Sequence, residues 1–81
     1  MRVTVKLFAA YREMAGAAAL PLELPEGATV GDALDALETL HPAVAATGYQ
    51  PLAARNLRHA SRDQVLSEGD EVAFFPPVSG G

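Results

Sequence analysis

The 81-residue sequence predicts an α+β fold, in which a mixed β-sheet carries one main helix across one of its faces. Three observations lead to this prediction. Residues 2–8 and 71–76 both alternate apolar side chains with others, as half-buried strands do. Residues 29–41 instead repeat their apolar side chains at helical spacing. Shorter strand-like segments lie between these elements without an internal repeat, so one shared core is expected.

The first half of the sequence predicts two strands separated by a short helix. "RVTVKLF" places Val3, Val5 and Leu7 on one face of a strand. "AAYREMAG" consists of good helix formers and ends at Gly16, which suits the left-handed position after a helix. The next run, "ALPLELP", alternates again, but Pro21 within it cannot donate a ladder hydrogen bond. We therefore expect this second strand at an edge of the sheet.

The main helix is marked at both of its ends. Thr29 is a good N-cap residue, and Asp32 three positions later is close to a capping box. His41-Pro42 marks the end of the helix. The apolar residues that recur at helical spacing are Val30, Ala33, Leu34, Leu37 and Leu40. "PAVAATG" then predicts one further helical turn.

The second half of the sequence predicts the remaining strands. "PLAAR" is a third strand, and "SRDQVL" is a candidate for a short fourth. In "EVAFFP", alternation places Val72 and Phe74 in the core and leaves Ala73 and Phe75 outside. The first and last strands are the most apolar, so we expect them side by side in the middle of the sheet. This is a β-grasp arrangement, as in ubiquitin, with residues 1–75 as the domain and 76–81 as a C-terminal Gly-Gly tail.

Composition excludes several functional classes. The net charge of −4 argues against nucleic-acid binding, which relies on Lys and Arg. The absence of cysteine excludes a disulfide framework, a thiolate zinc site and a thiol nucleophile. No apolar run approaches the roughly 18 residues that a membrane-spanning helix needs. We therefore expect a cytoplasmic protein that binds neither nucleic acid nor membrane.

No cluster of side chains predicts a metal or cofactor site. His41 and His59 have no Cys, Asp or Glu at metal-ligand spacing. Glu68, Asp70 and Glu71 occur at a predicted turn, where acidic residues are common, and they are not a specific calcium signal. The glycines match no phosphate-binding motif. We expect no bound cofactor and no metal.

The basic stretch "ARNLRHASR" is open to two interpretations. Arg55, Arg58 and Arg62 lie close together in the sequence, with His59 between them. They are either solvated residues of a strand and turn, or a docking patch for an acidic partner or a phosphorylated ligand.

The segment "FFPPVSGG" raises the question of function. Pro76-Pro77 favours an extended polyproline segment, and the six residues 76–81 can reach about 20 Å at roughly 3.3 Å each. Gly80 and Gly81 lack a Cβ, so their backbone can pass through a narrow channel. This pattern suggests that the Gly81 carboxylate reacts after activation, for example as an acyl-adenylate, although an inert, frayed terminus is the alternative.

"GDEVAFFPPVSGG" resembles the C-terminal signature of the MoaD family, the small subunits of molybdopterin synthase. "VKLFAAYREMAG", "TVGDALDALE" and "LAARN" extend the resemblance more loosely along the chain. Arg55 is a departure, because it stands beside Asn56 where the family pattern suggests an apolar residue. The departure affects which face of the third strand is buried.

The resemblance implies a β-grasp fold and a non-catalytic, sulfur-donating role. A MoeB-like, E1-like enzyme would use ATP to adenylate Gly81, which a sulfur donor would then convert to a thiocarboxylate. The tail would enter a MoaE-like large subunit, in an expected heterotetramer, and deliver sulfur to cyclic pyranopterin monophosphate. The residues that would contact this partner are Phe75, Pro76, Pro77, Val78, Ser79 and Gly80.

Three other functions share these sequence features. Sulfur carriers for thiamin synthesis or tRNA thiolation can have the same architecture and also end in Gly-Gly. A ubiquitin-like modifier would instead join Gly81 to lysines of target proteins. A β-grasp interaction domain with an inert tail is the remaining alternative.

Overall fold

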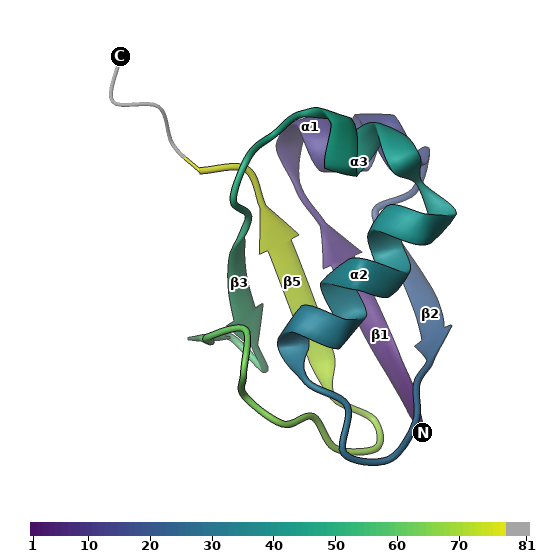
Figure 1. The fold of residues 1–81 in the computed structure, drawn as a ribbon, viewed down its shortest axis with the longest axis vertical. Helices are drawn as coiled ribbons and strands as arrows, with labels where there is room; N and C mark the ends of the chain where they lie inside the picture. The colour runs from purple at the N-terminus through teal and green to yellow at the C-terminus, as the bar shows by residue number, and fades with distance from the viewer. Residues whose placement is uncertain (78–81) are drawn as a thin grey trace.

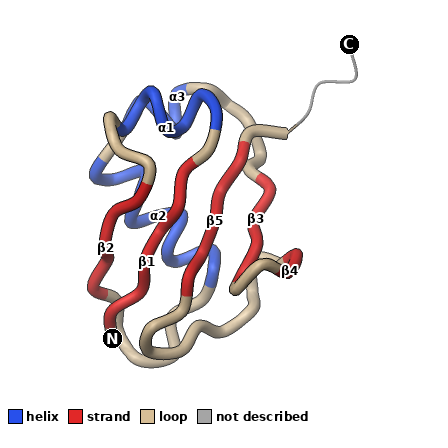
Figure 2. Tube along the Cα trace, turned by 180° about the vertical axis from the view of Figure 1, so that it is seen from behind, coloured by secondary structure: helices blue, strands red, loops and turns tan. Residues whose placement is uncertain are grey.

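A five-stranded mixed sheet with a helix across one face organises the computed structural model, which describes residues 1–77 (Figure 1). Its elements, in order, are β1 (Arg2–Leu7), α1 (Ala9–Ala15), β2 (Ala19–Glu23), α2 (Val30–Leu40), α3 (Pro42–Ala46), β3 (Leu52–Arg55), β4 (Arg58–His59) and β5 (Glu71–Phe75). Helix α2 crosses the sheet, and α1 and α3 lie together at one end of it. Figure 2 shows the opposite face of the sheet, over which the described residues place no helix.

The strand order confirms the predicted β-grasp arrangement. The sheet runs β2-β1-β5-β3-β4, with β1 and β5 parallel and the other neighbours antiparallel. The first and last strands therefore lie side by side in the interior of the sheet, as their apolar sequences predicted. Strand β2, which contains Pro21, lies at an edge, where the missing N–H of proline costs no ladder hydrogen bond.

The core lies between the sheet and α2, and the strand periodicity accounts for it. Val3, Val5 and Leu7 of β1 are buried, as are Val72 and Phe74 of β5. The buried residues of α2 are Val30, Gly31, Ala33, Leu34 and Leu37. Leu40, which shares their spacing, is exposed because it is the last residue of the helix, where the chain turns into α3.

Local sequence signals fix where α2 begins. The backbone N–H of Thr29 donates to Asp32 Oδ2 at 2.9 Å, and the N–H of Asp32 donates to Thr29 Oγ1 at 3.2 Å. This reciprocal capping box confirms the predicted start. A Cβ built on Gly31 would lie 3.2 Å from the carbonyl oxygen of Arg62, so glycine lets the loop between β4 and β5 pack closely on the first turn of α2.

The predicted fourth strand is wrong. The structure places β4 at Arg58–His59, directly after β3, while Val65 of the segment "SRDQVL" makes only a single bridge to Thr29. The reason is a tight turn at Asn56 and Leu57, whose φ angles are 48° and 73°. Two consecutive left-handed residues form the turn that best matches a twisted hairpin, so pairing begins immediately after β3.

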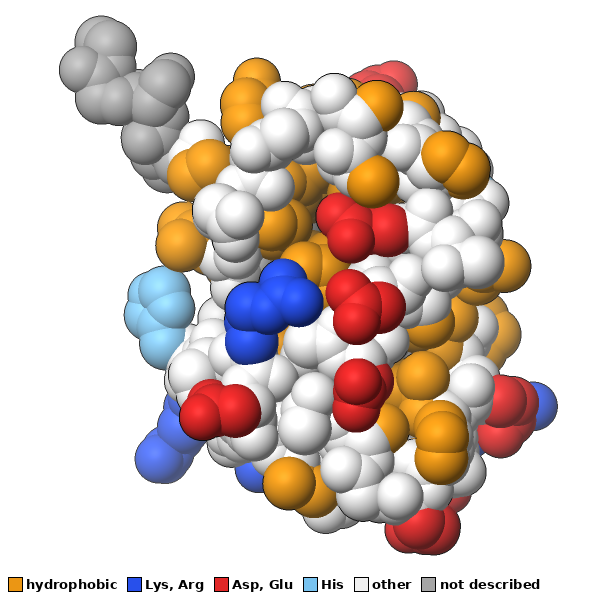
Figure 3. Space-filling view, in the orientation of Figure 1, with side chains coloured by type: hydrophobic (Ala, Val, Ile, Leu, Met, Phe, Trp, Pro, Cys, Tyr) orange, Lys and Arg blue, Asp and Glu red, His pale blue; other side chains and the backbone are white. Residues whose placement is uncertain are grey.

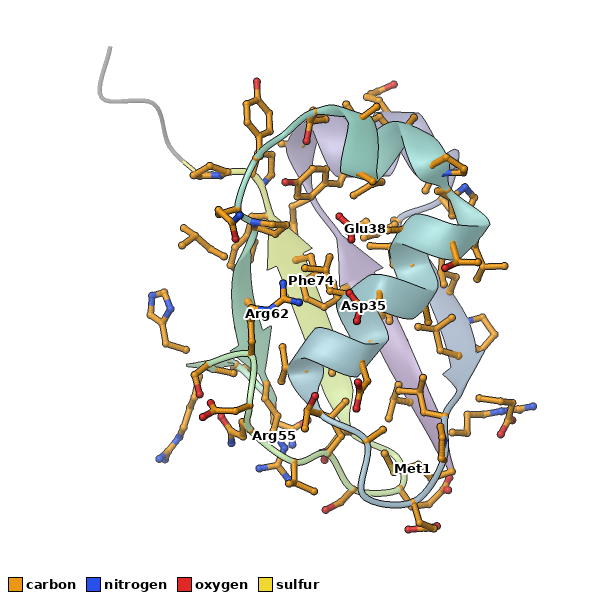
Figure 4. All side chains as sticks on the ribbon, in the orientation of Figure 1. Met1, Asp35, Glu38, Arg55, Arg62 and Phe74 are labelled. Atoms are coloured by element: carbon orange, nitrogen blue, oxygen red, sulfur yellow. The ribbon has the colours of Figure 1, made fainter. Side chains whose placement is uncertain are left out.

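The helix face of the molecule is strongly charged. Figure 3 shows acidic side chains gathered over α2, with a basic side chain beside them. Figure 4 labels the nearest pair, Asp35 and Arg62, and Arg62 Nη2 lies 3.6 Å from Asp35 Oδ1. The candidate site lies on the opposite, uncovered face of the sheet.

Candidate docking face

The uncovered face of the sheet contains a hollow of about 260 Å³, which we call the docking face. Its lining residues are Lys6, Phe8, Ala54, Leu57, Glu71, Ala73 and Phe75. They come from β1, β3, β5, the β3–β4 turn and the N-cap of α1, which is Phe8. The strand register places Lys6, Ala73 and Ala54 in one row across the sheet. The alternation that buries Phe74 turns the neighbouring residues of β5 toward this face.

Two aromatic rings form one wall of the docking face. The rings of Phe8 and Phe75 have centroids 5.3 Å apart and planes tilted by 44°. Such tilted pairs are favourable beyond the area that they bury. Phe8 is 45% exposed, whereas Phe74 on the core side of β5 is only 1% exposed. Because Phe75 lines the hollow while Phe74 is buried, the predicted orientation of Phe75, away from the core, is confirmed.

Leu57 lines the docking face from the turn between β3 and β4. This side chain is 91% exposed and adopts a φ of 73°, a conformation that leucine rarely takes. Ala9, which follows Phe8 at the start of α1, also has a positive φ, of 52°. Strained backbone is concentrated at functional sites more often than elsewhere. The positive φ angles of Leu57 and of Ala9, the neighbour of Phe8, therefore favour this hollow as a candidate site.

A charged pair lies within this apolar surface. Lys6 Nζ is 3.7 Å from Glu71 Oε2, and both side chains are more than a third exposed. Exposed pairs of this kind contribute little to folding stability. The pair therefore gives the docking face polarity without holding the sheet together.

A buried network positions the hairpin that presents Leu57. Asp70 is 7% exposed and accepts hydrogen bonds from Arg55 Nε at 2.6 Å, Asn56 Nδ2 at 3.0 Å and the Ser67 N–H at 2.7 Å. Burial alone would raise the pKa of Asp70, but these hydrogen bonds and the Arg55 charge hold it below its ordinary value. The N–H of Glu71 also donates to Asn56 Oδ1 at 2.9 Å. The network thus ties the turn to the start of β5.

This network explains two features of the sequence. Arg55 can replace an apolar residue in β3 because its guanidinium reaches a carboxylate at the end of the sheet. The acidic turn is structural, and within residues 1–77 no group of three or more His, Cys, Asp or Glu side chains could hold a metal. Within the basic stretch, Arg55 pairs with the buried Asp70, Arg62 makes an exposed pair with Asp35, and Arg58 is exposed.

The docking face ends where the conspicuous C-terminal sequence begins. Pro76 and Pro77 directly follow Phe75 at the end of β5. The other predicted site residues, Val78, Ser79, Gly80 and Gly81, lie outside the described residues. Sequence reasoning missed Phe8 and Leu57. Alternation along β1 could have found Phe8, since it shares the parity of Lys6, but nothing local in the sequence assigns Leu57.

A second depression, of about 400 Å³, lies beside the end of α1. It is lined by Arg12, Glu13, Gly16, Ala17 and Ala18. Although larger, it is more open and brings together no set of apolar side chains or reactive groups. We therefore take the docking face as the candidate site. Among residues 1–77, none of the helices has the length and hydrophobicity of a membrane-spanning segment.

The fold and the docking face define a ubiquitin-like β-grasp domain with a partly apolar hollow next to its C-terminal strand. The model of the ThiS family matches residues 5–81, and the chain belongs to this family. The chain is 40% identical over 84 residues to small archaeal modifier protein 1 of Haloferax volcanii, covering 94% of this chain and 97% of the relative. The crystal structure of that archaeal protein matches with a TM-score of 0.89 and 38% identity, covering 100% of both chains.

The molybdopterin synthase sulfur carrier subunit of Chlamydomonas reinhardtii is 36% identical over 83 residues, covering 100% of both chains. That of Arabidopsis thaliana is 32% identical over 81 residues, covering 100% of this chain and 84% of the relative. The resemblance to molybdopterin synthase small subunits is thus confirmed at the level of the family.

Proposed function

We propose that this protein is the sulfur carrier subunit of a molybdopterin synthase. In this proposal the Gly81 carboxylate is adenylated, converted to a thiocarboxylate, and used to deliver sulfur to cyclic pyranopterin monophosphate. The observation that carries the proposal is the docking face, which ends at Phe75, directly before "PPVSGG". A partner seated on this face would receive the segment that follows β5. The sequence relationship to two sulfur carrier subunits supports the same assignment.

The chemistry divides between the carrier and its partners. A carboxylate is a poor acyl donor, so a MoeB-like enzyme would use ATP to form the acyl-adenylate, and sulfur would then displace AMP. The resulting thiocarboxylate is a nucleophile that can attack an activated carbon of the substrate. A MoaE-like large subunit, in a heterotetramer with the carrier, would supply the acid, base and substrate-binding groups. The carrier would contribute the docking face and the sulfur.

A second candidate function is protein modification. Small archaeal modifier protein 1 has the highest identity among the relatives described above that match over most of the chain. In this role the activated Gly81 carbonyl would be attacked by a lysine amine of a target protein instead of by sulfur. Both functions need the same activation step and the same docking face.

Reconstitution distinguishes these functions. The carrier is incubated with the adenylating enzyme, ATP and a sulfide source, and its intact mass is followed for the replacement of one oxygen by sulfur. The sulfur-loaded carrier is then mixed with the large subunit and cyclic pyranopterin monophosphate. We expect molybdopterin, together with carrier that has returned to an ordinary carboxylate.

Two results would contradict the assignment to molybdopterin synthase. A thiocarboxylate that survives this mixture, but is consumed by a thiazole-forming or tRNA-thiolating enzyme, would move the carrier to another sulfur pathway. Carrier that never bears sulfur, and is found in isopeptide linkage to many proteins, would leave only the modifier function.

A further inference from the structure

Lys6 is the one lysine in the 81-residue sequence, and it lies inside the docking face. Its ammonium group is accessible, since the side chain is 45% exposed. The other primary amine is that of Met1, which donates a hydrogen bond to the Leu24 carbonyl at 2.6 Å and is partly buried. Of the two amines, Lys6 is therefore the better acceptor for an activated carboxyl group.

We propose that Lys6 accepts the activated C-terminus of a second copy of this chain, and that the isopeptide bond closes the docking face of the acceptor copy. The proposal rests on the proposed activation of Gly81. It adds a modification site and a consequence for sulfur delivery. A carrier modified in this way could no longer seat a partner on the surface that Phe8 and Phe75 form.

The shape and composition of the hollow suit this reaction. Its volume of about 260 Å³ leaves room for a narrow peptide segment. The incoming Gly80 and Gly81 carry no side chains to clash with the aromatic wall. Glu71 Oε2 lies 3.7 Å from Lys6 Nζ and keeps the amine oriented within the hollow.

The proposed step balances as an aminolysis. The Lys6 ammonium group loses one proton to Glu71 or water, and the neutral amine attacks the carbonyl carbon of the donor's acyl-adenylate. The bond between that carbon and the phosphate oxygen breaks, and AMP leaves with the electron pair. The second proton departs from the nitrogen to solvent. An amide between Gly81 and Lys6 remains, and no oxidant or reductant is needed.

The experiment separates donor from acceptor. The donor is heavy-isotope-labelled full-length carrier, and the acceptor is unlabelled carrier that lacks Gly81 and so cannot be activated. Both are incubated with the adenylating enzyme and ATP without a sulfur source. Trypsin then releases an acceptor peptide of residues 3–12 joined to a donor peptide of residues 63–81. We expect this labelled–unlabelled pair, with fragment ions that place the link on Lys6.

The matched control is a Lys6→Arg acceptor, which keeps the positive charge beside Glu71 but cannot form the amide. Its fold is checked by its thermal midpoint. We expect loss of the conjugate with this acceptor and the unmodified donor. A link at Met1, an intramolecular link within the donor, or undiminished conjugation to Lys6→Arg would overturn the proposal.

Two further measurements complete the test. Pyrophosphate exchange by the donor, recorded in the same mixture, reports activation independently of conjugation. Exchange without any conjugate refutes the Lys6 proposal alone, whereas absence of exchange refutes the proposed activation and the Lys6 proposal together. The purified conjugate should bind one equivalent of the large synthase subunit, where the same two copies unlinked bind two. Binding of two equivalents to the conjugate would refute closure of the docking face.

Discussion

Replacing Phe75 by alanine should separate partner binding from folding. In the structure, Phe75 lines the docking face and its ring packs against that of Phe8. Truncation to alanine removes this contact. An aromatic pair of this kind is worth about 0.5–1.5 kcal/mol of stability. An aromatic anchor at an interface is commonly worth about 2 kcal/mol or more of binding free energy. We therefore expect the Kd for the large subunit to rise about thirtyfold.

Phe74→Ala is the matched control, one residue away on the same strand. Phe74 is buried in the core, and such truncations cost about 3–5 kcal/mol of unfolding free energy. Urea unfolding measures stability, and isothermal titration calorimetry with the large subunit measures affinity. Phe8→Ala, alone and combined with Phe75→Ala, tests whether the two rings act together. If Phe75→Ala bound normally, or unfolded as readily as Phe74→Ala, the assignment of faces on β5 would be wrong.

Three further predictions test the strained turn, the buried carboxylate and the last residue. Leu57→Gly should raise the unfolding free energy by about 0.5–1 kcal/mol, because glycine tolerates a positive φ. The same variant should still weaken binding of the large subunit. A less stable variant would contradict the strain argument. Because the folded-state pKa of Asp70 lies below its ordinary value, its ionised form stabilises the fold above pH 3.8, and this contribution is lost as the pH falls through the folded-state pKa. Urea midpoints of the wild type and Asp70→Asn should therefore differ at neutral pH and converge in acid; a constant difference would refute this role. Deletion of Gly81 should abolish pyrophosphate exchange while leaving the thermal midpoint almost unchanged, since the core is built from residues 3–74, and a large fall in the midpoint would show a structural role.

The sequence predicted those parts of the fold that depend on local periodicity. Alternation in β1 and β5 identified the buried faces, and Thr29 with Asp32 identified the start of α2, because these signals act over a few residues. It could not predict β4, since the turn at Asn56 and Leu57 lacks the glycine that usually marks a left-handed pair.

The candidate site was only partly predictable for a similar reason. Phe75 follows from the alternation of one strand. The turn that presents Leu57 is held by hydrogen bonds from Arg55 and Asn56 to Asp70, across 15 and 14 positions of sequence, and no local pattern reports such contacts. The docking face is therefore a tertiary feature, whereas the unusual C-terminal segment "PPVSGG" is evident from its composition.

The place of β5 in the sheet has a consequence for synthesis of the protein. This strand is the last described element to leave the ribosome, yet it lies between β1 and β3 and joins two otherwise separate strand pairs. A nascent chain that has not released β5 can pair only β1 with β2 and β3 with β4, so the two halves of the sheet are not joined. The five-stranded sheet is therefore completed only when residue 75 is released, and the docking face forms in the same event. An activating enzyme that recognises this face would meet only chains whose translation has already passed the whole domain.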